Sequence, residues 1–402
     1  MIKSIHTSDT FSDDAVIGVL GGSGFIGSYF IKYLNSRSQN FTCLKVGTRN
    51  KRNFLKPDFR LPLEVVECDH LNYKQVTEFF RGCTHIIDFA GLAWQHPGGK
   101  ITSKNDLLKQ EIVQNAVSAL IKARNLQADQ LLVWTSTSAI ETMFARLSEK
   151  DSNTLRTEVE KLAAVLLEIP DKMLHDSSSL NIFLDKILSE YNFSSFRVSP
   201  TARTTIIYAT EFSYAYSKLL GQILLEKLCP ERVRILQISD VYGPGQDISE
   251  KILDPLVAAR RIQRYISAYK AIAEGHLEWL PVGTDLFGFT RDSQNLISQK
   301  IWSDWVFPTH VEDVCNLVLR SCSKGVDKPV LRVHGNRVSN LELMQFLKNY
   351  FNSSVRIIEN EPLDFEMVQN SQDLEVLGVS KLDLIDFKTG IKNWIEDHIA
   401  VT

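Results

Sequence analysis

A short glycine-rich segment near the start of the chain constrains its fold more than any other feature. Residues Gly22–Gly27 read Gly-Ser-Gly-Phe-Ile-Gly and follow the apolar run Val16–Leu20. The next stretch, Phe25–Leu34, has apolar residues at helical spacing. A strand that turns through glycines into a helix is typical of pyrophosphate-binding loops, because glycine allows a tight turn and a close approach of backbone N–H groups. The alternative is a strand-turn-helix in which the glycines only allow the turn and no ligand binds.

Apolar runs and helical patterns alternate along the chain, which predicts an α/β fold with a doubly wound parallel sheet of the Rossmann type. The patterns predict further strands at Cys43–Val46, Leu63–Glu67, His85–Phe89, Leu131–Thr135 and Val233–Ile238. They predict helices at Asp106–Ala123, Thr157–Glu168, Phe212–Leu228 and Leu253–Ala273. The polar run Asp176–Ser179 predicts a loop.

The same patterns divide the chain into a larger dinucleotide-binding domain and a smaller, C-terminal substrate domain. Residues 1–14 read as a polar leader, and residues 15–245 as the dinucleotide-binding domain. An insertion at about 140–209 interrupts this domain, and a segment at about 305–335 returns to it. The substrate-binding part is then formed by residues 246–304 and 336–402.

Composition favours a cytoplasmic protein without a nucleic-acid or membrane partner. The net charge of −3 gives no basic surface for nucleic acid. The six cysteines have no CxxC spacing and the nine histidines no HExxH spacing, so neither a disulfide framework nor a metal site is expected. The chain has no pattern of a signal peptide or membrane span, so no membrane partner is expected.

The end of the second predicted strand bears on the choice of cofactor. An acidic residue there would bind the ribose 2′-hydroxyl of NAD. This chain has Arg49 instead, followed by Lys51 and Arg52. A guanidinium pairs well with a 2′-phosphate, so this turn favours NADP(H) over NAD(H). A solvated basic turn is the alternative.

A second motif, Tyr214–Lys218, reads Tyr-Ala-Tyr-Ser-Lys on a predicted helix. Residues four apart project from one face, so Tyr214 and Lys218 would lie together. An ammonium group stabilises a phenolate, and this would bring the pKa of Tyr214 below its ordinary value of about 10. The pair would therefore serve as an acid or base, unless it is an amphipathic helix with this spacing by chance.

Hydroxyl groups and a short aromatic segment complete the candidate site. Residues Thr135–Ser138 form four consecutive hydroxyls after a buried strand, which suits either a substrate-binding site or a turn that satisfies its own backbone. Trp94, Gln95 and His96 follow another predicted strand, where this architecture places substrate-facing loops. Trp94 and His96 are therefore candidate substrate contacts, with an ordinary surface loop as the alternative.

With these motifs in order, the chain resembles the extended short-chain dehydrogenase/reductase family, of the NAD(P)-dependent epimerase/dehydratase type. The resemblance covers most of the chain. It rests on the segments Gly21–Gly27, Cys68–Asp69, Asp88–Gly91, Trp134–Thr137, Tyr214–Lys218, Val241–Gly245 and His310–Val314.

The resemblance implies roles for individual residues. Cofactor contacts are implied for Gly21, Gly24, Phe25, Ile26, Gly27, Asp69, Ala90, Gly91 and Val241, with Arg49 added from the basic turn. Tyr214 would be the acid/base, Lys218 its partner and ribose anchor, and Thr137 the residue that positions the substrate oxygen. Ser136 is a neighbouring candidate for the substrate. The family also implies a homodimer through the helix that carries the tyrosine.

Three departures from the family pattern narrow the expectation. The stretch between Thr137 and Tyr214 is much longer than usual. Ser138 and Ala139 replace the Asp-Glu pair of sugar-nucleotide 4,6-dehydratases, which disfavours dehydration. Ser303 stands where the family has a phosphate-binding arginine, although Arg291 is a nearby substitute. A nucleotide-sugar substrate is therefore less strongly expected than the family alone would imply.

The sequence as a whole predicts an oxidoreductase or epimerase that transfers hydride at a carbinol or carbonyl carbon of a small polar substrate. That substrate would be a sugar nucleotide or a related metabolite. Two alternatives remain at this stage. One is an NADPH-dependent carbonyl reductase of secondary metabolism, and the other is a non-catalytic protein that senses a dinucleotide or acts as a scaffold.

Overall fold

The computed structural model describes most of the chain, and every structural statement below concerns that part. The described residues are 11–37, 41–51, 54, 60, 62–91, 104–145, 147–190, 205–246, 261–276, 289–291, 297–301, 305–323, 325–359 and 373–401. Trp94, Gln95, His96, Arg52 and Ser303 lie outside these ranges.

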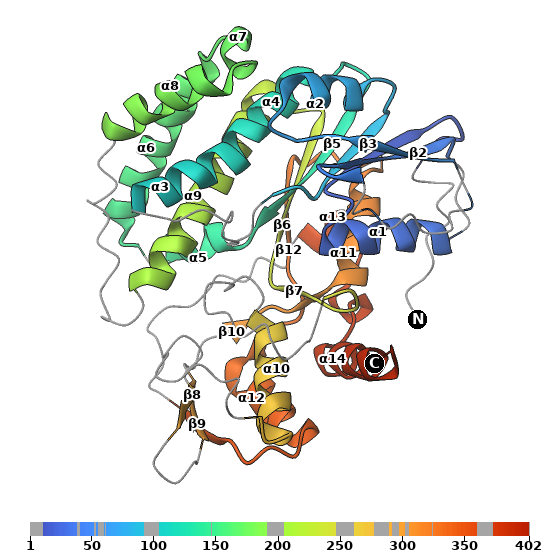
Figure 1. Cartoon of the computed structure of the whole chain (residues 1–402), viewed down its shortest axis with the longest axis vertical. Helices are drawn as coiled ribbons and strands as arrows, with labels where there is room; N and C mark the ends of the chain where they lie inside the picture. The colour runs from blue at the N-terminus through green and yellow to red at the C-terminus, as the bar shows by residue number, and fades with distance from the viewer. Residues whose placement is uncertain are drawn as a thin grey trace.

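A seven-stranded parallel sheet forms the centre of the molecule and confirms the predicted fold class (Figure 1). Its strand order is β12-β6-β5-β4-β1-β2-β3. The strands are β1 (Val16–Leu20), β2 (Cys43–Thr48), β3 (Leu63–Glu67), β4 (His85–Asp88), β5 (Leu131–Thr137), β6 (Val233–Ile238) and β12 (Val330–Val333). The central strands β1, β4, β5 and β6 are mostly buried along their length because helices cover both faces of the sheet.

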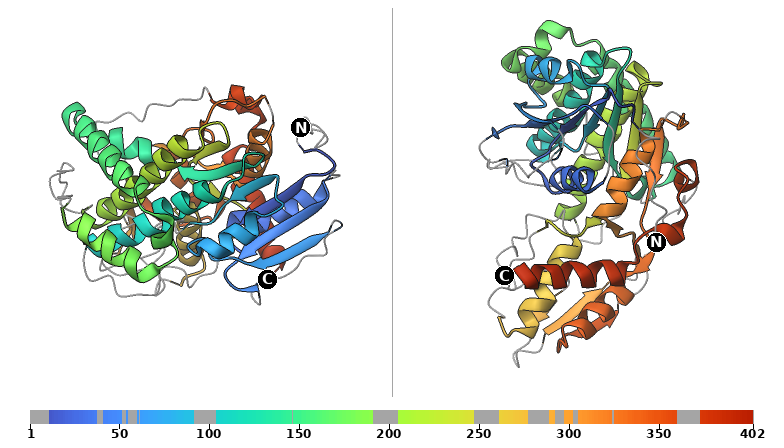
Figure 2. Two further views of the ribbon diagram at one scale, coloured as in Figure 1. Left: turned by 90° about the horizontal axis from the view of Figure 1, so that it is seen from above. Right: turned by 90° about the vertical axis from the view of Figure 1, so that its right-hand side faces the viewer.

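Each face of the sheet has its own layer of helices, as the two views of Figure 2 show. On one face lie α2 (Tyr73–Phe80), α3 (Lys104–Glu111), a π-helical turn (Ile112–Val117), α4 (Ser118–Asn125) and α9 (Thr205–Leu228). On the other lie α1 (Phe25–Ser36) and α11 (Val311–Ser321). An apolar core lies on each face of the sheet, and successive side chains of a strand point to opposite faces. Leu132 and Trp134 of β5 therefore pack in the first core, and Val133 packs in the second.

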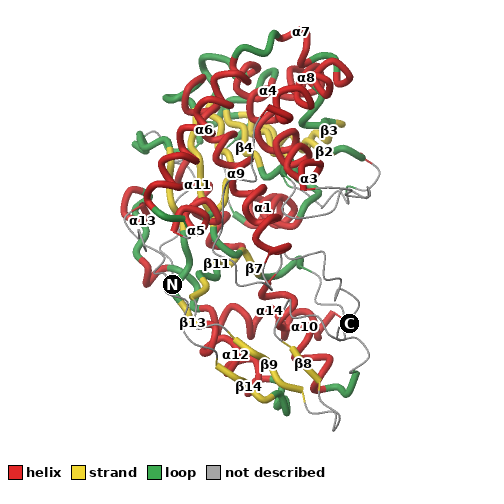
Figure 3. Tube along the Cα trace, turned by 90° about the vertical axis from the view of Figure 1, so that its left-hand side faces the viewer, coloured by secondary structure: helices red, strands yellow, loops and turns green. Residues whose placement is uncertain are grey.

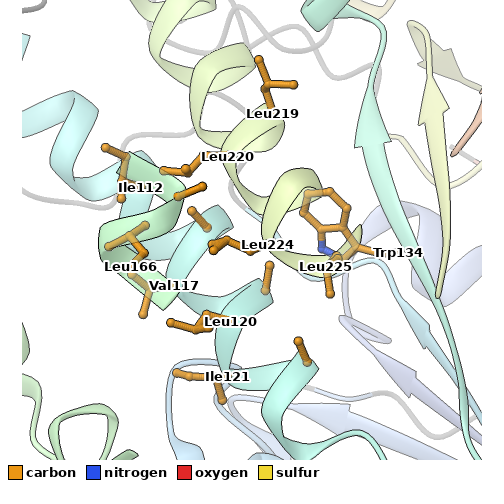
Figure 4. Close-up of a cluster of buried hydrophobic side chains, with 14 of the residues drawn as sticks. Ile112, Val117, Leu120, Ile121, Trp134, Leu166, Leu219, Leu220, Leu224 and Leu225 are labelled. Carbon is orange, nitrogen blue, oxygen red and sulfur yellow. The ribbon is translucent and has the colours of Figure 1, made fainter. Parts of the chain in front are cut away.

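Four helices between β5 and α9 extend the first core. They are α5 (Ala139–Ala145), α6 (Glu149–Leu167), α7 (Asp171–Leu174) and α8 (Ser177–Glu190). α6 begins at its cap Ser148, whose hydroxyl accepts a hydrogen bond from the Asp151 N–H at 3.1 Å. Its apolar side packs with α9 and the π-helical turn, in the cluster where Leu166 lies near Leu220 and Leu224 (Figure 4).

The polar run Asp176–Ser179 corrects one expectation, because it begins a helix and is not a loop. Asp176 precedes α8, and its carboxylate accepts hydrogen bonds from the Ser178 N–H at 3.0 Å and the Ser179 hydroxyl at 2.5 Å. Aspartate and serine are frequent at helix N-termini for this reason. Their polarity alone does not separate a helix cap from a loop.

The C-terminal elements form a smaller region beside the carboxyl edge of the sheet (Figure 3). Its strands are β7 (Val241–Tyr242), β8 (Phe289–Arg291), β9 (Ile297–Ile301), β10 (Trp305–Val306), β11 (Thr309–His310), β13 (Val338–Ser339) and β14 (Arg356–Glu359). Its helices are α10 (Arg261–Ala273), α12 (Asn340–Tyr350) and α14 (Phe387–Val401). α13 (Asp373–Val376) instead packs against the main sheet, where Leu374 joins the second core, and a 3₁₀ turn (Lys381–Asp383) follows it before α14 (Figure 1). α10, α12 and α14 share a separate apolar core that includes Tyr269, Leu343 and Trp394.

Candidate active site

The candidate site lies at the carboxyl edge of the main sheet, where β1 and β4 are neighbours. The order of the strands reverses at this point, since β2 and β3 lie to one side of β1 and β4 to β6 to the other. Doubly wound sheets bind ligands in the crevice outside such a reversal. The glycine-rich segment Gly21–Gly27 follows β1 there, and Ala90 and Gly91 follow β4.

The glycine-rich segment is packed so closely that side chains would not fit. A Cβ atom on Gly27 would lie 2.2 Å from the Gly21 carbonyl oxygen. Gly21 has a φ of +74°, and a Cβ there would lie 2.8 Å from the Ala90 nitrogen. Gly24 caps α1, and its N–H donates to the Gly21 carbonyl at 2.9 Å. This narrow turn at a helix N-terminus fits a pyrophosphate.

The other predicted cofactor contacts surround this turn. Phe25 is half-buried and faces Gly245, where a Cβ atom would lie 3.6 Å from its ring, and Ile26 packs partly into the core. Val241 is half-buried on β7, which pairs with β11. The motifs after β1 and β6 therefore meet in space.

Two polar candidates lie at the ends of β2 and β3. Arg49 is exposed directly after β2. Asp69 follows β3, and its carboxylate accepts a hydrogen bond from the Leu71 N–H at 3.0 Å. The Asp69 N–H donates to the Gln75 side chain at 2.7 Å, so the turn around this residue is fixed from both sides. Both positions lie on the edge of the sheet that carries the glycine-rich segment.

A buried ion pair supports the segment that follows β4. The Lys122 ammonium group lies 2.5 Å from an Asp88 carboxylate oxygen, and both side chains are fully buried. The other Asp88 oxygen accepts a hydrogen bond from the Ala90 N–H at 2.9 Å. Asp88 therefore connects α4 to the backbone that leads to Gly91.

Thr137, Tyr214 and Lys218 come together although they are distant in the sequence. β5 carries Thr137 at its last position, and its side chain hydrogen-bonds the Tyr214 phenol. The Lys218 ammonium group lies 5.9 Å from the centre of the Tyr214 ring and 4.5 Å from that of Trp134. It donates a hydrogen bond to the Thr135 carbonyl at 3.0 Å. The arrangement joins a phenol, a hydroxyl and an ammonium group at one strand end.

The electrostatics of this group differ from the sequence expectation. Burial and the nearby Glu111 carboxylate raise the pKa of Tyr214, against a smaller lowering by the Thr137 hydrogen bond. Burial lowers the pKa of Lys218 to about 8, partly offset by Asp88. Lys218 was expected to lower the pKa of Tyr214, but the burial of the phenol outweighs any such effect in this arrangement.

The remaining predicted substrate residues are not brought into this group. Ser136 is buried, and its hydroxyl has no hydrogen-bond partner among the described residues. Strand alternation places its side chain on the opposite face of β5 from Thr137. Trp94 and His96 lie outside the described residues, so they stay predictions.

Two polar residues that the sequence did not single out lie beside Lys218. Glu111 and Asn115, one helical turn apart, are at most 5% exposed. Burial raises the pKa of Glu111 to about 7, although Lys218 and the Asn115 hydrogen bond lower it somewhat. The available signal was a polar stripe of Glu111, Asn115, Ser118 and Lys122 along one predicted helix. Such a stripe normally reads as a solvated face.

A comparison with protein families agrees with these motifs. Residues 17–162 match the sequence model of the NAD dependent epimerase/dehydratase family. The family is one of enzymes, and the match contains the glycine-rich segment and β5. The match confirms the predicted resemblance over residues 17–162. A search of curated proteins gave no match to this chain.

Solved structures of similar fold cover nearly the whole chain. UDP-glucose 4-epimerase from Thermotoga maritima, solved with UDP-glucose, aligns with a TM-score of 0.57 at 14% identity and covers 96% of this chain and 99% of its own. dTDP-glucose 4,6-dehydratase from Bacillus anthracis, solved with NAD, aligns at 0.55 and 13% identity, covering 96% and 97%. UDP-N-acetylglucosamine 4-epimerase from Methanobrevibacter ruminantium, solved with UDP-N-acetylmuramic acid, aligns at 0.57 and 12% identity, covering 97% and 99%. At these identities the likeness establishes the fold.

Two further findings concern only the described residues. They contain no cluster of three or more histidine, cysteine or acidic side chains suited to a metal ion. None of their helices is long and apolar enough to cross a membrane.

Proposed function

We propose that this protein is an NAD(P)-dependent oxidoreductase or epimerase whose acid/base residue is Tyr214. The observation that carries the proposal is the meeting of Thr137, Tyr214 and Lys218 beside the close-packed glycine-rich segment. The family match to residues 17–162 supports the same reading. The reaction would be a hydride transfer at a carbinol or carbonyl carbon.

The residues divide the chemistry between them. Gly21, Gly24 and Gly27 would hold the pyrophosphate of the cofactor against the N-terminus of α1. When bound, the nicotinamide ring would accept or give the hydride. Tyr214 would move the proton of the substrate hydroxyl, and Thr137 would hold the substrate oxygen through the hydroxyl that now contacts the phenol.

Lys218 has a double role in this proposal. Its pKa of about 8 leaves the ammonium form dominant at neutral pH, so it would act as a hydrogen-bond donor beside the phenol. The raised pKa of Tyr214 makes the phenol a proton donor in the resting site. A bound substrate that pairs with Tyr214 would then receive its proton as hydride arrives, which corresponds to the reducing direction.

Tyr214→Phe tests this mechanism. Loss of a general acid lowers turnover by about 10²- to 10⁴-fold, and binding of the reduced cofactor should stay unchanged because the phenol is not assigned to it. Tyr216→Phe is the matched control, since it removes a buried hydroxyl from another face of the same helix. Wild-type turnover in Tyr214→Phe on an identified substrate would refute the assignment.

The proposed cofactor is NADP(H) in preference to NAD(H). The support is the exposed Arg49 directly after β2, where a guanidinium would reach a 2′-phosphate. The dehydratase named above was solved with NAD. Titration of the purified protein with NADPH and NADH separates the two, and NADPH should bind more tightly. Tighter binding of NADH would remove the role given to Arg49.

Consumption of the cofactor separates the candidate reactions. A carbonyl reductase uses one NADPH for each product molecule, whereas an epimerase returns the hydride and shows no net consumption. UDP-sugars are a natural first panel because two of the structures above were solved with them. A protein that binds the dinucleotide but never oxidises or reduces it would instead be a sensor or scaffold.

A homodimer stays a prediction, and the fold restricts how it would form. The expected interface was the helix that carries Tyr214. In this chain α5, α6 and α3 pack against α9, and the residues 213–222 of α9 are all buried. We infer that a homodimer, where it forms, uses another surface.

A further inference from the structure

We propose that Glu141 is a positioning residue, which fixes α5 to the end of β12 and thereby holds the Thr137 hydroxyl beside Tyr214. The inference rests on the proposed function and extends it by one residue. Thr137 is the last residue of β5, and α5 begins at Ala139. Glu141 lies in the first turn of α5, only four residues from Thr137.

The end of β5 and the start of α5 form one hydrogen-bonded turn. The Thr137 hydroxyl oxygen accepts a hydrogen bond from the Ala139 N–H at 3.1 Å. The Glu141 N–H donates to the Ser138 carbonyl at 3.0 Å. The same Thr137 side chain hydrogen-bonds the Tyr214 phenol. A movement of α5 would therefore displace the hydroxyl that contacts the proposed acid/base.

The Glu141 carboxylate contacts two side chains at the end of β12. Its Oε1 atom lies 2.8 Å from the Arg332 Nε atom. Its Oε2 atom lies 3.2 Å from the His334 Nε2 atom, without the alignment of a hydrogen bond. Both partners have further contacts. The Arg332 N–H donates to the Asp373 carboxylate at 2.7 Å, and the buried His334 ring packs on Phe307 at 5.7 Å between centroids.

The register of the sheet places this contact close to Thr137. Thr137 pairs with Ile238 of β6, and Ile238 pairs with Val333 of β12. The three residues form one row across the carboxyl edge. Neighbouring strands lie about 4.8 Å apart, so Val333 is about 10 Å from Thr137. The side chains of Arg332 and His334 flank Val333 in sequence and reach back to α5 from there.

Apolar packing alone does not fix the position of α5. Ile140 and Met143 are buried and hold one side of this seven-residue helix. Hydrophobic contact is non-directional, so it permits small shifts of a short helix along its neighbours. An arginine–carboxylate contact has a defined geometry. The Glu141–Arg332 ion pair is therefore the contact that would set one position for α5, and with it the Thr137 hydroxyl.

The ¹³Cζ resonance of Tyr214 tests this role, because it responds to the hydrogen bond of the phenol. In protein labelled with ¹³Cζ-tyrosine, Tyr214→Phe identifies the resonance. Thr137→Val, which replaces the hydroxyl with a methyl group, gives the change expected for a lost hydrogen bond. Glu141→Gln and Arg332→Met should each move the Tyr214 resonance in that same direction. The double variant should move it no further than the larger single effect, because both remove one interaction.

Glu342→Gln is the matched control. It makes the same substitution in an ion pair of the same length, since Glu342 lies 2.8 Å from Lys388, on α12 and away from β5. The Tyr214 resonance should not change in this variant. An unchanged Tyr214 resonance in Glu141→Gln would overturn the inference. An equal change in Glu342→Gln would overturn it too, because the cause would be a general loosening.

Kinetics add a second measurement that keeps the two proposals distinct. On an identified substrate, Glu141→Gln should lower kcat about tenfold and leave KM within about twofold, because a displaced Thr137 affects the reacting geometry. Cofactor binding should not change, since the glycine-rich segment follows β1. A loss confined to cofactor binding would contradict the role of Glu141. A wild type without turnover on any substrate would count against the proposed function, while the Tyr214 resonance still decides the role of Glu141.

Discussion

At the residue scale, the acid/base group contains one more titratable residue than the sequence suggested. Glu111 reaches the site from the end of α3, where it fixes Asn115 and raises the pKa of Tyr214. Tyr214 and Lys218 are four residues apart, so local helix geometry brings them together. Glu111 and Thr137 come from other elements, and only tertiary packing brings them close.

Glu111 should make the stability of the protein depend on pH. Its folded pKa of about 7 lies above its unfolded value of 4.5. Between these values the unfolded state releases its proton first, so stability is full below about pH 4.5 and falls as the pH rises toward 7. Urea unfolding at pH 5 and pH 7 should show the wild type losing stability relative to Glu111→Gln.

Glu231→Gln serves as the matched control for this experiment. Glu231 is exposed in the turn before β6 and takes no part in the site. The free energy of unfolding of Glu231→Gln should change between the two pH values by the same amount as that of the wild type. If that of Glu111→Gln also changes by this amount, the raised pKa is not a property of the folded protein.

At the element scale, most strands and helices follow from local patterns, whereas their ends do not. The predicted strand Leu63–Glu67 agrees in full with β3. The predicted helix Phe212–Leu228 begins earlier, at Thr205. The run Asp176–Ser179 was read wrongly because its serines and aspartate cap α8. The position of a helix end depends on capping hydrogen bonds and on packing, and the polarity of the residues alone does not reveal either.

The buried pair between Asp88 and Lys122 is the strongest single link between two elements near the site. Lys122→Met should lower the free energy of unfolding by about 3–5 kcal/mol, because it leaves the Asp88 carboxylate buried without its partner. Denaturant unfolding measures this change. Combining Asp88→Asn with Lys122→Met should recover part of the loss.

Lys109→Met provides the comparison for that experiment. Lys109 pairs with Asp185 at 2.6 Å, but the Asp185 side chain is 64% exposed. Exposed ion pairs contribute only about 0–1 kcal/mol, so this variant should be close to the wild type. Equal losses for Lys109→Met and Lys122→Met would contradict the importance of burial.

At the scale of the whole molecule, the helices between β5 and α9 belong to the main core. Leu155, Val159 and Leu162 of α6 are fully buried in the same cluster as Leu220 and Leu224 of α9. The sequence left open whether this insertion covers the active site, forms an interface or only elaborates the surface. In the described part of the insertion, α5 and α6 pack against α9, the helix that carries Tyr214.

Leu162→Ala tests how far the core depends on these helices. Removal of a fully buried leucine side chain should cost about 2–5 kcal/mol of unfolding free energy, measured by denaturant titration. Ile182→Ala on α8 is the control, because that side chain is 71% exposed and its loss should stay within about 0.5 kcal/mol. A small effect of Leu162→Ala would mean that α6 is a separable addition.

The sequence by itself determined the features that depend on near neighbours along the chain. The turn at Gly21–Gly27 depends on glycines, because a side chain at Gly21 or Gly27 would collide with neighbouring backbone atoms. The pairing of Tyr214 with Lys218 follows from the helical repeat. The alternation of apolar runs determined the parallel sheet. Each of these is a local constraint, so the order of the residues is enough to specify it.

Only the tertiary structure decided which polar groups are removed from water. Glu111, Asn115, Ser118 and Lys122 form a stripe that a helical pattern assigns to solvent, yet all four are buried. α9 and β4 supply their partners, since Ser217 bonds Asn115 and Asp88 pairs with Lys122. Burial depends on what packs against a helix, and that information lies elsewhere in the chain. The same physical reason explains why the pKa values of the site could not be predicted from the sequence.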